Sequence, residues 1–287
     1  MIMFNDFLQS YKALENSGVE NSLFETLRLF DLLASGALRK ADLSALDQEK
    51  VDLQCLIEKR KRGVPWEYIL GRAHFMGNLF FCSPDTLIPT DETQLLVNAA
   101  LQAINKKERA GNSPLLIEIG TGCGNIAVSL ALGSHTTRIM ASDISPAAVD
   151  IAHMNVYRFN LQDRISLFSG DLFVPFQNSG HEGNIDFIVC NPPYIPTASL
   201  GKLSREIIDH EPRIALDGGP YGIDFYRRLI TDSLPLLKPE GMLFFEIGER
   251  QEKLVTRLLE KNDGYYDIEF IADNATVRAI RAVKKRI

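Results

Sequence analysis

A cationic excess, paired cysteines and long apolar runs are all missing from this chain of 287 residues. Lys and Arg number 31 against 37 Asp and Glu, and the net charge of −6 argues against a dedicated nucleic-acid-binding surface. The 4 cysteines show no CxxC spacing and the 5 histidines no HExxH pair, so no metal site is indicated. No apolar run approaches the roughly 18 to 20 residues of a membrane span, and no signal-peptide core is visible. We therefore expect a cytoplasmic protein without a membrane partner.

The length instead favours two domains, at a prior of about 150 residues each. Residues 1–71 show helical periodicity and no strand signal, which predicts a small helical domain. Its expected helices include one beginning near Ser22 and one over 44–62, which ends at Gly63-Val64-Pro65. The basic run Lys59–Arg62 is typical of solvated charges at a helix C-terminus; a contact with an RNA backbone or an acidic partner is the alternative.

Residues 72–90 predict a β-hairpin linker. An aromatic, β-prone stretch covers His74–Phe81, and a second apolar stretch surrounds Leu87. Ser83-Pro84-Asp85 between them is a turn signal. We therefore expect the two strands of the hairpin on either side of this turn.

The remainder, residues 91–287, alternates between strand and helix patterns. Strands are expected over 115–119, 138–142, 165–168, 185–190, 242–247, 266–271 and 277–283. Helices are expected after Gly124, after Ser145, over 222–237 and over 252–261. This alternation predicts an α/β domain with a mostly parallel sheet and helices on both faces.

Three expected strand ends carry residues suited to a nucleoside. The first strand is followed by a glycine-rich loop formed by Gly120, Thr121, Gly122, Cys123 and Gly124, where backbone can come close to a ligand at a helix N-terminus. Asp143 ends the second strand, where a carboxylate can accept hydrogen bonds from ribose hydroxyls. Asp171 and Leu172 follow the third, near an expected adenine ring. A tight packing turn remains the alternative for the loop alone.

The fourth strand end carries Asn191-Pro192-Pro193-Tyr194. An amide or exocyclic amine is a poor nucleophile, because its lone pair is delocalised. The Asn191 side chain and the Pro192 carbonyl can accept its two N–H groups and orient it towards an electrophilic methyl. Tyr194 can offer an aromatic face to a flat group. We predict Asn191, Pro192 and Tyr194 as catalytic, and Pro193 with them as substrate-binding.

Together these motifs resemble the HemK/PrmC family, the N5-glutamine methyltransferases of peptide chain release factors. The resemblance extends to Gly63-Val64-Pro65-x-x-Tyr68, to Glu211-Pro212-Arg213 and to Glu246-Ile247-Gly248. It implies a helical substrate-recognition domain, a hairpin linker and a Rossmann-like, seven-stranded class I methyltransferase domain. It further implies S-adenosylmethionine at the Gly120–Gly124 loop, Asp143 and Asn191, and a release factor's GGQ glutamine at residues 191–194.

One segment departs from the family pattern. Where the family shows LIPRPETE, this chain reads LIPTDETQ over Leu87–Gln94. This change keeps open a small-molecule amide or amine N-methyltransferase. NPPY also occurs in adenine-N6 and guanine-N2 nucleic-acid methyltransferases, and a cofactor-binding scaffold without turnover is a fourth alternative. The acidic balance argues against a stable nucleic-acid partner, and the intact NPPY argues against the scaffold.

Overall fold

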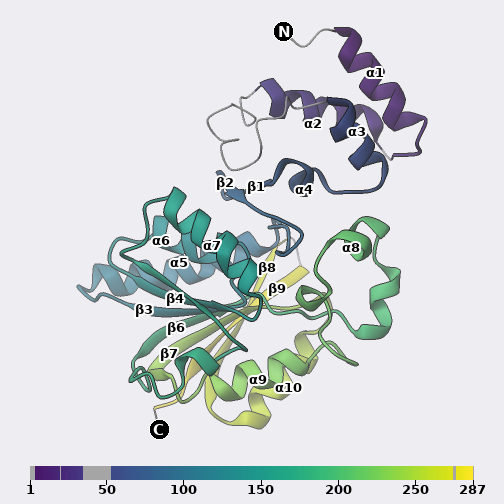
Figure 1. Cartoon of the computed structure of the whole chain (residues 1–287). Helices are drawn as coiled ribbons and strands as arrows, with labels where there is room; N and C mark the ends of the chain where they lie inside the picture. Colours follow the sequence, from purple (N-terminus) through teal and green to yellow (C-terminus); the bar gives the residue numbers. More distant parts are fainter. Residues whose placement is uncertain (1–3, 20, 35–52, 274–275, 287) are drawn as a thin grey trace. The chain divides into compact units, whose positions relative to one another are not determined.

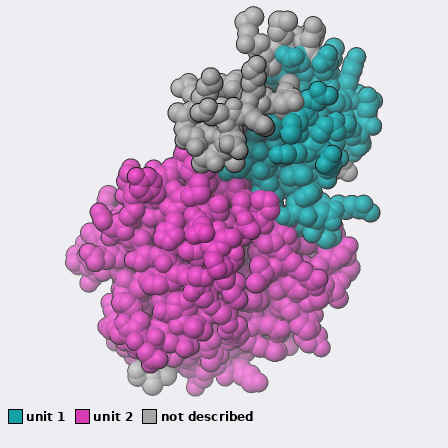
Figure 2. Space-filling model, viewed as in Figure 1, with its two compact units in different colours: residues 1–71, 204–210 teal, residues 72–203, 211–287 magenta. Residues whose placement is uncertain are grey.

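The computed structural model describes residues 4–19, 21–34, 53–273 and 276–286, and these form two compact units (Figure 2). The smaller unit comprises the described residues up to Gly71 together with Ser204–His210. The larger unit comprises Arg72–Leu203 and the described residues from Glu211 onward. The hairpin region therefore belongs to the larger unit. None of the described helices has the length and apolar character of a membrane span.

The smaller unit is helical, with a core of Leu14, Leu29, Ile57 and Trp66. Its helices are α1 (Phe4–Glu15), α2 (Ser22–Ala34), α3 (Leu53–Lys61), α4 (Trp66–Leu70) and α8 (Arg205–His210). Of the helix expected over 44–62, residues 44–52 lie outside the described part of the chain. Sequence analysis did not predict α8 or its membership of this unit.

The basic run at the end of α3 is not one solvated face. Lys59 and Arg62 are exposed, but Arg60 is only 8% exposed. Its guanidinium lies within 3.1 Å of the Glu25 carboxylate and 2.8 Å of the Glu206 carboxylate. Buried charges require such partners, because desolvation is costly without them. The prediction of solvated charges is therefore wrong for Arg60.

The larger unit contains a seven-stranded sheet in the order β5-β4-β3-β6-β7-β9-β8 (Figure 1). Its strands are β3 (Leu115–Ile119), β4 (Arg138–Asp143), β5 (Ile165–Ser169), β6 (Ile185–Cys190), β7 (Leu237–Glu246), β8 (Tyr265–Asp273) and β9 (Thr276–Lys284). β9 pairs antiparallel with both β7 and β8, and the other pairings of this sheet are parallel. The predicted mostly parallel α/β sheet is confirmed.

Helices cover both faces of this sheet (Figure 1). One apolar cluster joins the sheet to α5 (Thr93–Arg109), α6 (Asn125–Leu132) and α7 (Pro146–Arg158); another joins it to α9 (Asp224–Asp232) and α10 (Glu252–Asn262). A central strand covered on both faces is mostly apolar, and every residue of β6 is buried, including its one charged residue, Asp186. Short 3₁₀ helices lie at Val174–Phe176, Thr197–Lys202 and Arg213–Ala215. The elements expected from sequence did not include α5.

The hairpin differs from its prediction in the position of its turn. Its strands are β1 (Arg72–Phe75) and β2 (Asn78–Phe81), joined at Met76-Gly77. Both turn residues have positive φ, 47° and 73°, as a two-residue turn with the twist of a hairpin requires. The stretch around Leu87 is not a strand. It lines the cavity described in the next section.

Candidate functional site

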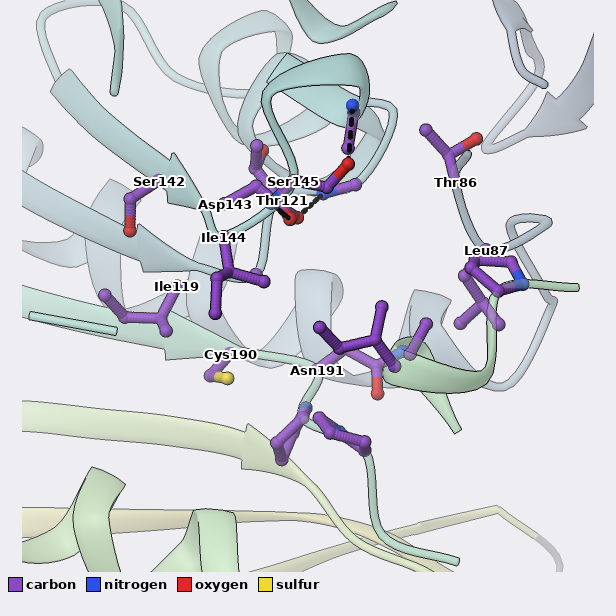
Figure 3. A pocket seen from close by; sticks show the side chains of 18 of the residues that line it. Thr86, Leu87, Ile119, Thr121, Ser142, Asp143, Ile144, Ser145, Cys190 and Asn191 are labelled. Atoms are coloured by element: carbon purple, nitrogen blue, oxygen red, sulfur yellow. Dashed lines mark hydrogen bonds between the residues drawn. The ribbon is translucent and has the colours of Figure 1, made fainter. Parts of the chain in front are cut away.

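The site lies at the carboxyl edge of the sheet, where the strand order reverses. β3 pairs with β4 on one side and with β6 on the other, so their following loops diverge. Ile119 is aligned with Ser142 across one pairing and with Cys190 across the other. Open α/β sheets bind ligands at such a point. A cavity of about 280 Å³ is present there (Figure 3).

The glycine loop contributes close backbone approach to this cavity. Gly120 and Gly122 have φ of 71° and 54°, a region that glycine adopts without steric cost. Gly122 has no atom within 4 Å of the place where a Cβ would stand. The amides of Gly120 and Thr121 donate to the Ser142 carbonyl, at 2.8 and 3.0 Å. These two N–H groups are therefore already hydrogen-bonded within the protein. What the loop provides for a ligand is space close to the backbone, more than unpaired N–H groups.

Asp143 fixes the geometry of the loop from the end of β4. Its carboxylate accepts from the Gly122 amide at 2.8 Å and from the Ser145 amide at 2.9 Å (Figure 3). Burial raises the pKa of this carboxyl, while the hydrogen bonds from Ser145 and Gly122 oppose that shift. Each oxygen keeps a further lone pair for a ligand hydroxyl. Ile144 beside it is 49% exposed and lines the cavity.

The cavity suits an adenosine-containing ligand. Its lining combines the Asp143 carboxylate with apolar side chains, among them Ile144, Leu172 and Phe225. A carboxylate beside apolar walls matches a ribose attached to a flat base. Asp171 is ion-paired with Arg228 of α9 at 2.7 Å, and both residues also line the cavity.

Asn191, Pro192 and Pro193 form the wall that follows β6. The Asn191 side chain donates from Nδ2 to Oγ1 of Thr93, 3.1 Å away. The segment is held from behind, since Gln251 Nε2 donates to the Tyr194 carbonyl at 2.9 Å. Gly222 is needed on this side, because a Cβ there would stand 2.3 Å from that carbonyl oxygen. NPPY is thus fixed on both sides.

Tyr194 does not line the cavity. Its hydroxyl donates to Oε1 of Glu246 at 3.1 Å, and burial with the neighbouring Glu246 charge raises the pKa of the phenol above its ordinary value. Tyr194 therefore supports the wall from behind. Its expected role as a stacking platform for substrate is not seen in this arrangement.

The structure brings together most of the predicted residues and leaves three outside. Nine line the cavity: Gly120, Thr121, Gly122, Asp143, Asp171, Leu172, Asn191, Pro192 and Pro193. Tyr194, Cys123 and Gly124 do not. Cys123 is buried, and its carbonyl accepts from Asn155 at 2.7 Å. Gly124 instead packs against α7, where a Cβ would stand 3.2 Å from that of Ala152. Both therefore face protein.

Several lining residues carry no signal of their own in the sequence. The departing segment contributes Leu87, Ile88, Pro89, Thr90 and Thr93. Arg228, Phe225 and Ile214 reach the cavity from segments distant in sequence. Only the fold identifies Arg228 and Phe225, because α9 contains no recognisable motif; Ile214 directly follows the Glu211-Pro212-Arg213 segment.

Comparison with known proteins agrees with this geometry. The family described as "Methyltransferase small domain" matches residues 91–238. A release factor glutamine methyltransferase of Moorella thermoacetica is 38% identical, over 76% of this chain and 74% of its own length. The enzyme of that name from Geobacter sulfurreducens is 35% identical, over 91% of this chain and 88% of its own length. The enzyme of that name from Bacillus subtilis is 33% identical, over 94% of this chain and 93% of its own length.

Solved structures share the fold at low identity. The N-terminal domain of human METTL16 in complex with SAH has a TM-score of 0.53 at 18% identity, covering 88% of this chain and 93% of that one. A Thermus thermophilus 16S rRNA N2 G1207 methyltransferase, in complex with AdoMet and guanosine, also scores 0.53, at 17% identity over 75% and 50%.

The fold and the site define an S-adenosylmethionine-dependent N-methyltransferase. Within that class the curated relatives are more specific. The chain belongs to the release factor glutamine methyltransferase family.

Proposed function

We propose that this enzyme methylates the N5 amide nitrogen of the glutamine in the GGQ motif of peptide chain release factors. The observation that carries the proposal is the match over 91% of the chain, at 35% identity, to a relative with the name release factor glutamine methyltransferase. The match extends through both units. A substrate of this kind would place the enzyme where translation terminates, in the cytoplasm, and requires no stable nucleic-acid partner.

The chemistry of the site supports this assignment. S-adenosylmethionine supplies a methyl group made electrophilic by the attached sulfonium. The glutamine nitrogen would take up this methyl group, the electron pair of the carbon–sulfur bond would stay on the departing thioether sulfur, and one amide proton would be released to water. Asn191 Oδ1 and the Pro192 carbonyl would accept the two amide hydrogens and stabilise positive charge on nitrogen. Gly120, Gly122 and Asp143 would hold the cofactor.

Transfer of labelled methyl groups to an intact release factor tests the proposal. The expected result is one methyl group on the GGQ glutamine, located by tandem mass spectrometry of the peptide. A release factor with that glutamine changed to glutamate is the matched control and should stay unlabelled.

The same assay separates the alternatives. Calorimetry with the cofactor first shows that the site is functional. If the cofactor binds while the GGQ peptide stays unlabelled, the release-factor assignment is wrong. Label in the small-molecule fraction of an extract would then indicate a small amide or amine substrate, and label in RNA or DNA a nucleic-acid amine.

A further inference from the structure

A chain of hydrogen bonds runs behind the cavity wall from Asn191 to Glu246. Asn191 Nδ2 lies 3.1 Å from Thr93 Oγ1, and Thr93 Oγ1 donates to Glu246 Oε2 at 2.7 Å. Glu246 is 2% exposed and ends β7, while Thr93 begins α5. Neither Thr93 nor Glu246 has been given a role above in binding the cofactor or the substrate.

Counting hydrogens determines which way the Asn191 amide points. A threonine hydroxyl has one hydrogen, and the Glu246 carboxylate, when ionised, can only accept. The Thr93 hydrogen therefore goes to Glu246, and its oxygen is left to accept from Asn191. Only the NH₂ end of the amide can donate, so Nδ2 faces Thr93 and Oδ1 is directed away from it.

We propose that Thr93 and Glu246 are positioning residues that hold the Asn191 amide with its oxygen towards the substrate nitrogen. The proposal rests on the proposed function insofar as that nitrogen belongs to a release-factor glutamine. With the amide reversed, NH₂ would face the substrate N–H groups, and two donors would meet. The pair thereby selects the one orientation that can stabilise developing positive charge.

The orientation depends on the charge of Glu246. Once protonated, Glu246 can donate to Thr93, whose hydrogen is then free to bond Asn191 Oδ1 in the reversed amide. Burial raises the pKa of Glu246 to about 7, opposed by the hydrogen bonds from Thr93 and Tyr194. Among the neighbouring ionisable groups, Glu92 raises the pKa of Glu246 and Arg278 lowers it. Cys190 and Tyr226 also lie near Glu246, and its charge raises their pKa values.

The pH dependence follows from that charge. Above about 7 Glu246 is ionised and the amide is held. Below that pH the constraint is lost, so turnover should fall as the pH drops through this range. Glu246→Gln removes the titration, and its turnover should be lower and flat with pH.

Substitution of Thr93 tests the positioning directly. Thr93→Val keeps the shape but removes the hydroxyl, and we expect kcat to fall about 10- to 100-fold with cofactor affinity unchanged. Thr93→Ser keeps the hydroxyl and should restore kcat to within about threefold of the parent. Thermal unfolding checks that each variant folds. Unchanged kcat in Thr93→Val, or an equal loss of cofactor affinity, would overturn the proposal.

A spectroscopic experiment needs neither Thr93 variants nor substrate. With ¹⁵N-asparagine labelling, the Asn191 side-chain NH₂ signals, assigned by their absence from Asn191→Asp, should titrate near pH 7 in the parent and not in Glu246→Gln. If the chemical shifts of these signals do not change with pH in the parent, the proposed positioning role of Thr93 and Glu246 is wrong. If they titrate while release factor stays unmethylated, the positioning pair holds and the proposed substrate is wrong.

Discussion

Arg60 and Glu206 form a two-pronged ion pair across 146 residues of sequence. Nη1 lies 2.8 Å from Oε1, and Nη2 lies 3.2 Å from Oε2. The same guanidinium donates from Nε to Glu25 at 3.1 Å. A planar guanidinium can pair two N–H groups with one carboxylate and still donate from Nε to another, a fork geometry that an ammonium does not have. This contact joins α8 to the helices of the smaller unit.

Arg60→Ala should loosen α8. The change leaves Glu25 without its ion pair, although its side chain is only 13% exposed, and costs about 2 kcal/mol of unfolding free energy. Hydrogen exchange of Arg205–His210 and the melting temperature measure the effect. The neighbouring exposed Arg62 provides the control: Arg62→Ala should change stability by less than about 0.5 kcal/mol. Equal protection of α8 in both variants would contradict this role for Arg60.

The sheet was predictable from sequence because its strands are buried on both faces. Ile185–Cys190 and Leu115–Ile119 are mostly apolar segments, each with one acidic residue, beside strong turn signals, and the structure reproduces both ranges. The position of the hairpin turn was not predictable, because Ser83-Pro84-Asp85 is a stronger local turn signal than Met76-Gly77. α8 was missed for a different reason. Its membership of the smaller unit depends on a long-range ion pair, which no local pattern reports.

The residues that line the cavity were predictable where polar side chains directly follow strands. Asp143 and Asn191 each follow a strand directly, and parallel strands bring their carboxyl ends to one edge. The orientation of Tyr194 was not predictable, because its hydroxyl is directed to Glu246, which is 52 residues away. Thr93 lies in the LIPTDETQ segment, where the sequence shows a departure from the family pattern but no signal for a role of this threonine. Its partner atoms could be identified only in three dimensions.

Asn191→Ala should reduce turnover much more than cofactor binding. Loss of the side-chain acceptor removes an interaction that strengthens as charge develops on the substrate nitrogen. The rate of methyl transfer should therefore fall by about 100-fold or more. The cofactor half of the cavity, around Gly122 and Asp143, keeps its contacts. Single-turnover kinetics and calorimetry make the comparison. Equal losses of rate and affinity would show that Asn191 serves the cofactor or the fold instead.

Asp143→Asn should weaken cofactor binding. One oxygen becomes an NH₂ group, which cannot accept from the Gly122 or Ser145 amide, so the loop loses a hydrogen bond to a charged acceptor. The expected loss of affinity is about 10- to 100-fold. Asp150→Asn is the matched control, because Asp150 is exposed on α7 and does not line the cavity. Equal affinity losses in both variants would contradict the assignment of Asp143.

Glu118→Gln should make stability less sensitive to pH. Burial raises the pKa of Glu118 from 4.5 to about 8, so the folded protein keeps a proton that the unfolded chain releases in this range. Parental stability therefore falls as pH rises from about 4.5 to 8, at up to about 1.4 kcal/mol per pH unit. The glutamine is always neutral, and its carbonyl can still accept from Thr121 Oγ1, now 2.8 Å from Glu118 Oε2.

Urea unfolding of both proteins at pH 5 and pH 9 measures this difference. The difference in unfolding free energy in favour of Glu118→Gln should grow with pH by a few kcal/mol, at up to about 1.4 kcal/mol per pH unit. The other carboxyls with raised pKa values, Asp143 and Glu246, are present in both proteins and cancel in the comparison. Parallel pH profiles would mean that Glu118 is ionised in the folded state, and the glycine loop would then rest on a buried charge.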